Sequence, residues 1–128
     1  MADPARDILE INNLLAEYCL ACDECRFEDF ARLFAENGEM RAFRRAWTGF
    51  DELVSFISAA PEGIHLCGLP HIALDGDRAE VKVNFVFHTH DKQVGSQGLY
   101  IDELVRTADG WRFQWRQIKI LKPRETSA

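Results

Sequence analysis

The sequence has no long apolar run and almost no clustering of basic residues. No stretch of about 18 consecutive apolar residues occurs, so a membrane span is not expected. The 128 residues carry a formal net charge of −6, and the one short basic group is Arg41, Arg44 and Arg45. We interpret this group as a solvated loop whose arginines pair with local acids. Neither a membrane nor a nucleic acid is therefore an expected partner.

Cysteine is scarce, and the start of the sequence lacks the features of a secretion signal. Residues 1–4 show neither the charged nor the apolar region of a signal peptide. This favours a cytoplasmic protein whose four cysteines are thiols. Cys19, Cys22 and Cys25 recur at intervals of three, but the first two fall on the apolar stripe of a helix, where free cysteine packs as a small hydrophobe. We expect no metal site and no cofactor.

The length and composition indicate one globular domain. A chain of this size buries roughly two thirds of its unfolded surface, which is enough for a core and an internal pocket. Its content of 47% hydrophobic and 28% charged residues is ordinary for such a domain. We expect a single domain over residues 1–128, with an ordered core of about 7–121 and a frayed tail over 123–128.

The longest strand pattern runs from Arg78 to His90 and follows the turn sequence Asp75-Gly76-Asp77. Apolar residues occupy every second position, as expected when strand side chains alternate between two faces. These residues are Val81, Val83, Phe85 and Phe87. A single strand cannot bury its own apolar face, so the rest of the chain should cover it.

Three helices are expected before most of the strands. They span 7–22, 27–36 and 52–59, with Asn37-Gly38 ending the second helix and Asp51 capping the third. Further strands are expected over 39–43, 64–69, 71–74, 97–106 and 111–121. Helices first and antiparallel strands afterwards indicate an α+β fold, with the helices packed on one face of a curved sheet.

The last two long strands carry apolar residues on both faces. Leu99 and Ile101 alternate with Tyr100 and Leu104. Only one face of the sheet covers the core, so the other face also needs cover. We therefore expect a homodimer through the outer face of the sheet.

Several motifs occur in a characteristic order. They are Asp23 at the end of a helix, Phe27-x-x-Phe30-x-x-Leu33-Phe34, His65 in a short strand, Asp75-Gly76-Asp77, Tyr100-x-Asp102-Glu103-Leu104 and Asp109-Gly110-Trp111-Arg112-Phe113. This order resembles the SnoaL-like branch of the nuclear-transport-factor-2-like superfamily over about residues 7–120. The resemblance implies a cone-shaped α+β barrel of mostly antiparallel strands, with three N-terminal helices on the concave face. Its mouth would hold a small, mostly apolar ligand.

Within this superfamily the sequence is similar to scytalone dehydratase and hexachlorocyclohexane dehydrochlorinase. Both carry an aspartate at the end of the first helix and a histidine in the strand after the third helix, which match Asp23 and His65. The resemblance also implies a pocket role for Arg116 on the last strand. Other aligned pocket positions, which would bind substrate, are Tyr18, Met40, Phe56, Phe85, Phe87 and Tyr100.

Asp23 and His65 have the chemistry of a proton-transfer pair. A neutral imidazole removes a proton, and the carboxylate fixes its tautomer and stabilises the imidazolium. Arg116 or Tyr100 would stabilise a developing anion. We therefore predict a cofactor-independent, dehydratase-like lyase, or an isomerase or cyclase if no group leaves. Its substrate would be a small hydrophobic molecule, cyclic or polyketide-like.

Structural roles are the alternatives for each of these residues. Asp23 would cap the second helix, His65 would be a hydrogen-bonded core histidine, and Arg116 would lie at the surface or the dimer interface. At the level of the whole protein, two alternatives remain. One is a non-catalytic module for ligand binding or dimerisation, and the other is the small subunit of an oxygenase.

Three further histidines could form a metal site with Asp91. The alternation along the long strand instead places His88 and His90 on the face opposite Phe85. A surface or interface role is therefore expected for them, and the role of His71 is left open.

Overall fold

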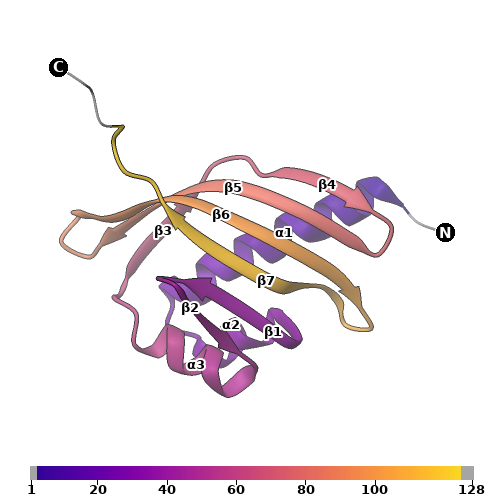
Figure 1. Ribbon diagram of the computed structural model, residues 1–128, viewed down its shortest axis with the longest axis horizontal. Helices are drawn as coiled ribbons and strands as arrows, with labels where there is room; N and C mark the ends of the chain where they lie inside the picture. The colour runs from indigo at the N-terminus through magenta and orange to yellow at the C-terminus, as the bar shows by residue number, and fades with distance from the viewer. Residues whose placement is uncertain (1–2, 125–128) are drawn as a thin grey trace.

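The computed structural model describes residues 3–124 and shows one curved sheet with helices on its concave side (Figure 1). The helices are α1 (Pro4–Asp23), α2 (Phe27–Arg32) and α3 (Phe50–Ser58). The strands are β1 (Phe34–Ala42), β2 (Arg45–Thr48), β3 (Gly63–Cys67), β4 (His71–Asp75), β5 (Arg78–Thr89), β6 (Val94–Thr107) and β7 (Gly110–Ile120). Residues 125–128 of the predicted frayed tail lie outside the described part.

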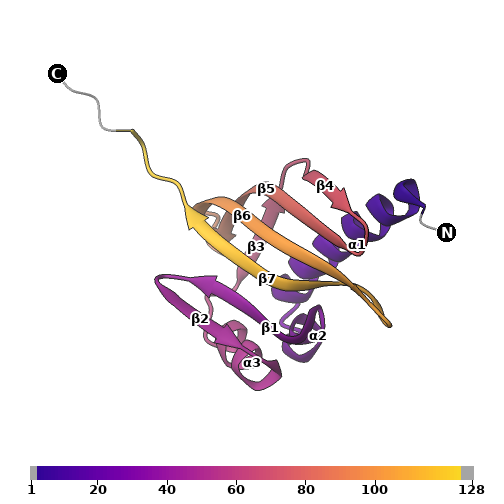
Figure 2. The same ribbon diagram turned by 45° about the vertical axis from the view of Figure 1, so that its right-hand side comes forward.

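The strand order in the sheet is β2-β1-β7-β6-β5-β3, and β4 also pairs with β5. All of these pairs are antiparallel except β1 with β7. Figure 2 shows α2 and α3 together at the β1–β2 end of the sheet, while α1 runs behind β5, β6 and β7. The predicted α+β class is confirmed. The sheet curves into part of a cone and stays open.

The long alternating pattern forms β5, as predicted. Its inward residues Ala79, Val81, Val83, Phe85 and Phe87 are buried. Pairing with β6 on one edge and with β3 and β4 on the other places this strand within the sheet. The apolar face of β5 therefore forms one wall of the core, at the side of the sheet where β3 is the edge strand.

The first helix begins close to its expected start. Asp3 caps α1, with its side chain accepting a hydrogen bond from the Arg6 backbone at 3.3 Å, and Pro4 occupies the first turn. The helix buries Ile11, Leu15 and Tyr18 against the sheet. Its last residue is Asp23, so the end of this helix fixes where that carboxylate lies.

One helix end and one strand differ from the sequence prediction. The second helix was expected to reach Glu36, but α2 ends at Arg32 because Phe34 pairs with Phe113 of β7. Strand β2 was not predicted, because Phe43 and Arg44 make its turn with positive φ values of 54° and 61°. Such a turn favours glycine or asparagine, and neither Phe43 nor Arg44 gives that signal in the sequence.

The predicted cap of α3 is also wrong. Gly49 takes the N-cap position with φ of 84°, and no side chain caps the helix there. Asp51 lies inside the first turn, where a negative charge interacts favourably with the helix dipole.

The outer face of the sheet is mixed in character. Leu99, Ile101 and Val105 are half-buried there, between exposed polar residues of β5 and β7 such as Lys82 and Gln117. The homodimer through this face stays a prediction. In the part of the chain that the structure describes, no helix has the length and apolarity needed to cross a membrane.

Candidate active site

Asp23 and His65 meet where the end of α1 packs against β3. The Asp23 Oδ1 atom lies 2.7 Å from the ring Nδ1 of His65. Both Asp23 oxygens also accept the His65 backbone N–H, at 3.0 and 3.2 Å. An ionised carboxylate only accepts hydrogen bonds, so Nδ1 is the donor in this contact, and in the neutral imidazole Nε2 is left with the lone pair of a base. The alternative in which Asp23 caps α2 is wrong, because Arg26 occupies that cap position.

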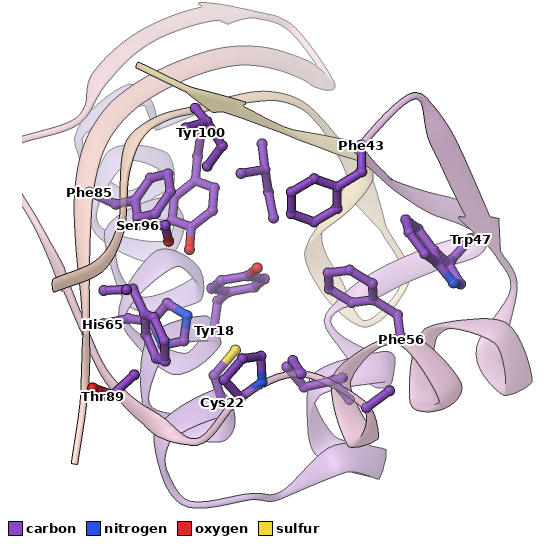
Figure 3. Close-up of a pocket in the computed structure, with 18 residues that line it drawn as sticks. Tyr18, Cys22, Phe43, Trp47, Phe56, His65, Phe85, Thr89, Ser96 and Tyr100 are labelled. Carbon is purple, nitrogen blue, oxygen red and sulfur yellow. The ribbon is translucent and has the colours of Figure 1, made fainter. Parts of the chain in front are cut away.

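The histidine ring forms part of the wall of an apolar cavity of about 600 Å³. The cavity lies between α1, α3 and the concave face of the sheet. Figure 3 shows Phe56, Phe43 and Trp47 on one side, and His65, Phe85 and Tyr100 on the other. Of the pair, only His65 lines this cavity. The side chains of His65 and Asp23 are only 17% and 12% exposed, so their contact is largely shielded from bulk water.

Two phenols supply polar groups in this largely apolar cavity. Figure 3 shows the hydroxyls of Tyr18 and Tyr100 pointing into it. Burial raises the pKa of both phenols well above the usual value, so each remains an O–H donor at neutral pH. The Tyr18 ring contacts Tyr100 edge-on, with centroids 5.4 Å apart, and Tyr100 stacks on Phe85 at 4.3 Å. These contacts fix the positions from which the hydroxyls can donate.

A second ionic pair lies behind the phenols. Arg116 donates from Nε to one oxygen of Asp102 at 2.7 Å and from Nη2 to the other at 3.0 Å. Both side chains are fully buried. The guanidinium also lies over the rings of Tyr18 and Tyr100, 4.3 and 3.8 Å from their centroids. Burial lowers the pKa of Arg116, but the adjacent Asp102 carboxylate outweighs it and holds that pKa above its usual value.

The arrangement suits acid–base chemistry more than metal chemistry. Within residues 3–124, no three histidine, cysteine, aspartate or glutamate side chains are grouped so that they could hold a metal ion. His65 offers a base at the cavity wall, and the phenols offer hydrogen bonds to an oxygen atom of a ligand.

The family model of the SnoaL-like domain matches residues 3–117, which is most of the chain. The chain belongs to the SnoaL-like family. Uncharacterized proteins of Mycobacterium tuberculosis and Mycobacterium bovis are each 34% identical to it over 117 residues. The match covers 83% of this chain and 80% of theirs.

Solved structures show the same fold. A protein of unknown function from Mycobacterium tuberculosis superposes with a TM-score of 0.87 at 25% identity, covering 94% of this chain and 75% of that one. A candidate scytalone dehydratase from Novosphingobium aromaticivorans superposes with a TM-score of 0.78 at 19% identity, covering 98% and 91%. The predicted membership in the SnoaL-like branch is confirmed.

The structure of this SnoaL-like protein brings most of the predicted pocket residues together, but not all. Six line the cavity: Tyr18, Phe56, His65, Phe85, Phe87 and Tyr100. Met40 and Arg116 do not, because both are fully buried behind its wall. The lining of this cavity therefore does not support the predicted direct contact of these two residues with substrate. The surface alternative for Arg116 is wrong for the same reason.

The remaining histidines are not part of the cavity wall. His71 and His90 are exposed, and His90 Nε2 lies 4.0 Å from a Glu62 carboxylate oxygen. His88 is half-buried and pairs with Ile64 across β3 and β5. These three histidines therefore cannot contact a ligand in the cavity beside His65.

The sequence prediction missed several residues of the site. Phe43 and Trp47 were missed together with β2, and no local signal marks their turn. Cys22 follows Tyr18 by four residues on one helical face, which was a usable signal. Asp102 shares the inward side of β6 with Tyr100 and Leu104, so strand alternation could have identified it as buried.

Proposed function

We propose that this SnoaL-like protein is a cofactor-independent lyase of the dehydratase type, or an isomerase or cyclase. Its substrate would be a small hydrophobic molecule, cyclic or polyketide-like. His65 takes a proton from carbon through Nε2, and Asp23 holds the ring and stabilises the imidazolium. The observation that carries this proposal is the 2.7 Å contact between Asp23 and His65 at the wall of an apolar cavity.

The lining of the cavity supports the substrate class. Its aromatic and aliphatic walls favour an apolar ring or chain, while the hydroxyls of Tyr18 and Tyr100 would bind an oxygen substituent. Proton abstraction beside a carbonyl places negative charge on that oxygen, and the phenols would donate hydrogen bonds to it. The hydroxyl on the neighbouring carbon then leaves as water with the proton that His65 took, which completes a dehydration. Without a leaving group, His65 returns this proton to another carbon in an isomerisation, or to the new alkoxide when the enolate carbon attacks a carbonyl in a ring closure.

The similarity to a candidate scytalone dehydratase agrees with a dehydratase but, at 19% identity, supports the fold alone. A non-catalytic ligand-binding module is the second candidate. The sparsely polar cavity wall favours it, because such a wall binds apolar molecules without requiring chemistry. The two functions differ in one property, which is proton exchange at a carbon atom of the bound ligand.

The experiment therefore measures proton abstraction directly. The protein is incubated in D2O with a panel of small cyclic β-hydroxy ketones, and mass spectrometry follows deuterium uptake and loss of water. We expect His65→Asn to slow the exchange roughly 100-fold or more while the cavity still binds an apolar fluorescent dye. His71→Asn is the matched control and should change nothing, because His71 is exposed and outside the cavity.

Binding of the panel by the wild-type protein with neither exchange nor product would favour the ligand-binding module. Exchange at the wild-type rate in His65→Asn would refute the assigned base.

A further inference from the structure

Two thiols face each other across the junction of α1 and β3. Cys19 Sγ and Cys67 Sγ lie 3.6 Å apart although 48 positions separate them in the sequence. Both line a groove of about 370 Å³, and Asp23 and His65 line it too. This groove is distinct from the aromatic cavity that Phe56 lines. Cys67 is exposed and Cys19 is half-buried, so small molecules reach this pair from solvent.

The contacts between α1 and β3 keep the two sulfur atoms close to each other. Asp23, one helical turn after Cys19, accepts the His65 backbone N–H and so ties the end of α1 to β3. Cys67 follows His65 by two residues and therefore lies on the same face of the strand. A disulfide has its sulfur atoms about 2.05 Å apart, so the two sulfur atoms would have to approach by about 1.6 Å from the observed 3.6 Å.

The same contact activates one of the two sulfur atoms. The hydrogen bond between the two thiols lowers the pKa of Cys67 to about 7 and raises that of Cys19. Burial and the charges of Asp102 and Asp23 act to raise the Cys67 pKa, while Arg116 acts to lower it. The contact therefore favours the thiolate on Cys67, which is also the more exposed of the two sulfur atoms.

We propose that Cys19 and Cys67 form an oxidisable pair, which a peroxide converts into a disulfide linking α1 to β3. The Cys67 sulfur attacks one oxygen of hydrogen peroxide. The S–O bond forms, the O–O bond breaks, and the leaving hydroxide takes up a proton to become water. The Cys19 sulfur then attacks the sulfenic acid on Cys67. The S–S bond forms, the S–O bond breaks, and hydroxide leaves with the Cys19 proton as a second water.

The other two cysteines are poorly placed for this reaction. Burial raises the pKa of the Cys22 thiol, which is only 7% exposed. Cys25 lies beyond the end of α1 with a positive φ of 56°, and its thiol neighbours Glu62 rather than another sulfur. Oxidation should therefore be selective for the Cys19–Cys67 pair, and Cys25 provides a matched control.

The link would brace the two elements that carry Asp23 and His65. A cross-link that closes a loop of this length restricts the unfolded chain, so we expect the oxidised protein to melt roughly 5–15 °C above the reduced one. This inference is independent of the proposed reaction, because it concerns the sulfur atoms and uses no substrate.

The test uses the wild-type protein, treated with hydrogen peroxide in the folded state. Digestion without reductant and mass spectrometry should yield one peptide pair joined through Cys19 and Cys67, and dithiothreitol should separate it. Cys25→Ser should give the same cross-link. In Cys19→Ser the reaction should stop at the Cys67 sulfenic acid, which dimedone traps.

Three results would overturn the proposal. One is a disulfide between Cys67 residues of two copies instead of the internal link. Another is over-oxidation of Cys67 in the wild-type protein with Cys19 left free. The third is an oxidised wild-type protein that melts at or below the temperature of the reduced one.

Discussion

Two acid–base pairs in this protein have the same shortest contact and opposite surroundings. Asp23 and His65 lie 2.7 Å apart, and so do Asp102 and Arg116. The first pair is partly exposed, and its imidazole can act as a base. The second is sealed from solvent, and its arginine stays charged.

The difference shows that access to the cavity and the ability to accept a proton, not the contact distance, separate a reactive pair from a structural one. A sealed guanidinium has no route to a ligand and cannot accept a proton. It instead holds the rings of Tyr18 and Tyr100 from behind through cation–π contacts. The open pair can exchange protons with a ligand, so catalysis belongs there if this SnoaL-like protein is an enzyme.

The largest effect should come from breaking the sealed pair. Arg116→Met leaves the Asp102 carboxylate buried without a partner, which we expect to cost about 3–5 kcal/mol of unfolding free energy in urea denaturation. The double variant Arg116→Met, Asp102→Leu removes both charges and should recover most of that loss. A single variant within about 1 kcal/mol of wild type would show that the pair is not effectively sealed.

Breaking the open pair should act on turnover more than on stability. Asp23→Asn keeps an oxygen that can accept the His65 backbone N–H, so the stability loss should be about 1 kcal/mol. It removes the charge that stabilises an imidazolium, so conversion of a substrate found in the deuterium assay should fall roughly 100-fold. The control is Asp51→Asn on α3, which is exposed. Equal turnover in both variants would contradict the assigned role of Asp23.

A third pair sharpens the comparison, because its arginine is partly exposed. Asp7 accepts two hydrogen bonds from Arg106, at 2.7 and 2.9 Å, and one from the Trp111 indole at 3.1 Å. The Arg106 hydrogen bonds hold the pKa of Asp7 below its unfolded value of 3.8. Its contribution to stability is therefore complete above that value and is lost as the pH falls through the lower, folded pKa.

We expect the melting temperature of Asp7→Asn to lie below that of wild type at neutral pH and to converge on it toward pH 2. Calorimetric scans over this range measure the gap. A constant gap between the two proteins at every pH would show that the charge of Asp7 does not contribute.

The smallest effect should come from the phenol that lies between the two main pairs. Tyr18→Phe keeps the ring beneath Arg116 and removes only the hydroxyl in the cavity. We expect the affinity for an aromatic ketone to fall by about 1 kcal/mol, or roughly fivefold, measured by calorimetric titration. Affinity for a hydrocarbon of the same size should not change. An equal loss for both ligands would mean that the ring, not the hydroxyl, had been disturbed.

Much of the fold could be predicted from local patterns. Alternation identified β5, and helical periodicity placed α1 so that Asp23 falls at its end. The resemblance to the SnoaL-like branch then proposed His65 as the partner of Asp23. What failed were features that depend on pairing, such as the end of α2 at Arg32, where the chain leaves the helix to join β7.

The buried position of Arg116 could not be predicted from the alternation along β7, for a related reason. Trp111 and Phe113 face the core, so strict alternation along β7 would place Arg116 on the outer face of the sheet. The register between β6 and β7 instead shifts by one residue, which leaves Gln114 without a partner and pairs Arg116 with Asp102. A one-residue shift moves every later side chain to the other face, so Arg116 becomes buried beside Asp102.

The sequence by itself determined the class of the fold and the inward face of β5, because alternation and helical periodicity depend only on the spacing of apolar residues. It also determined the chemistry that Asp23 and His65 bring to their contact. Only the tertiary structure decided which charged pair is sealed and which is open. That outcome depends on a bulge in β7 and on the packing of α1 against β3, and neither is encoded in the spacing of any one segment.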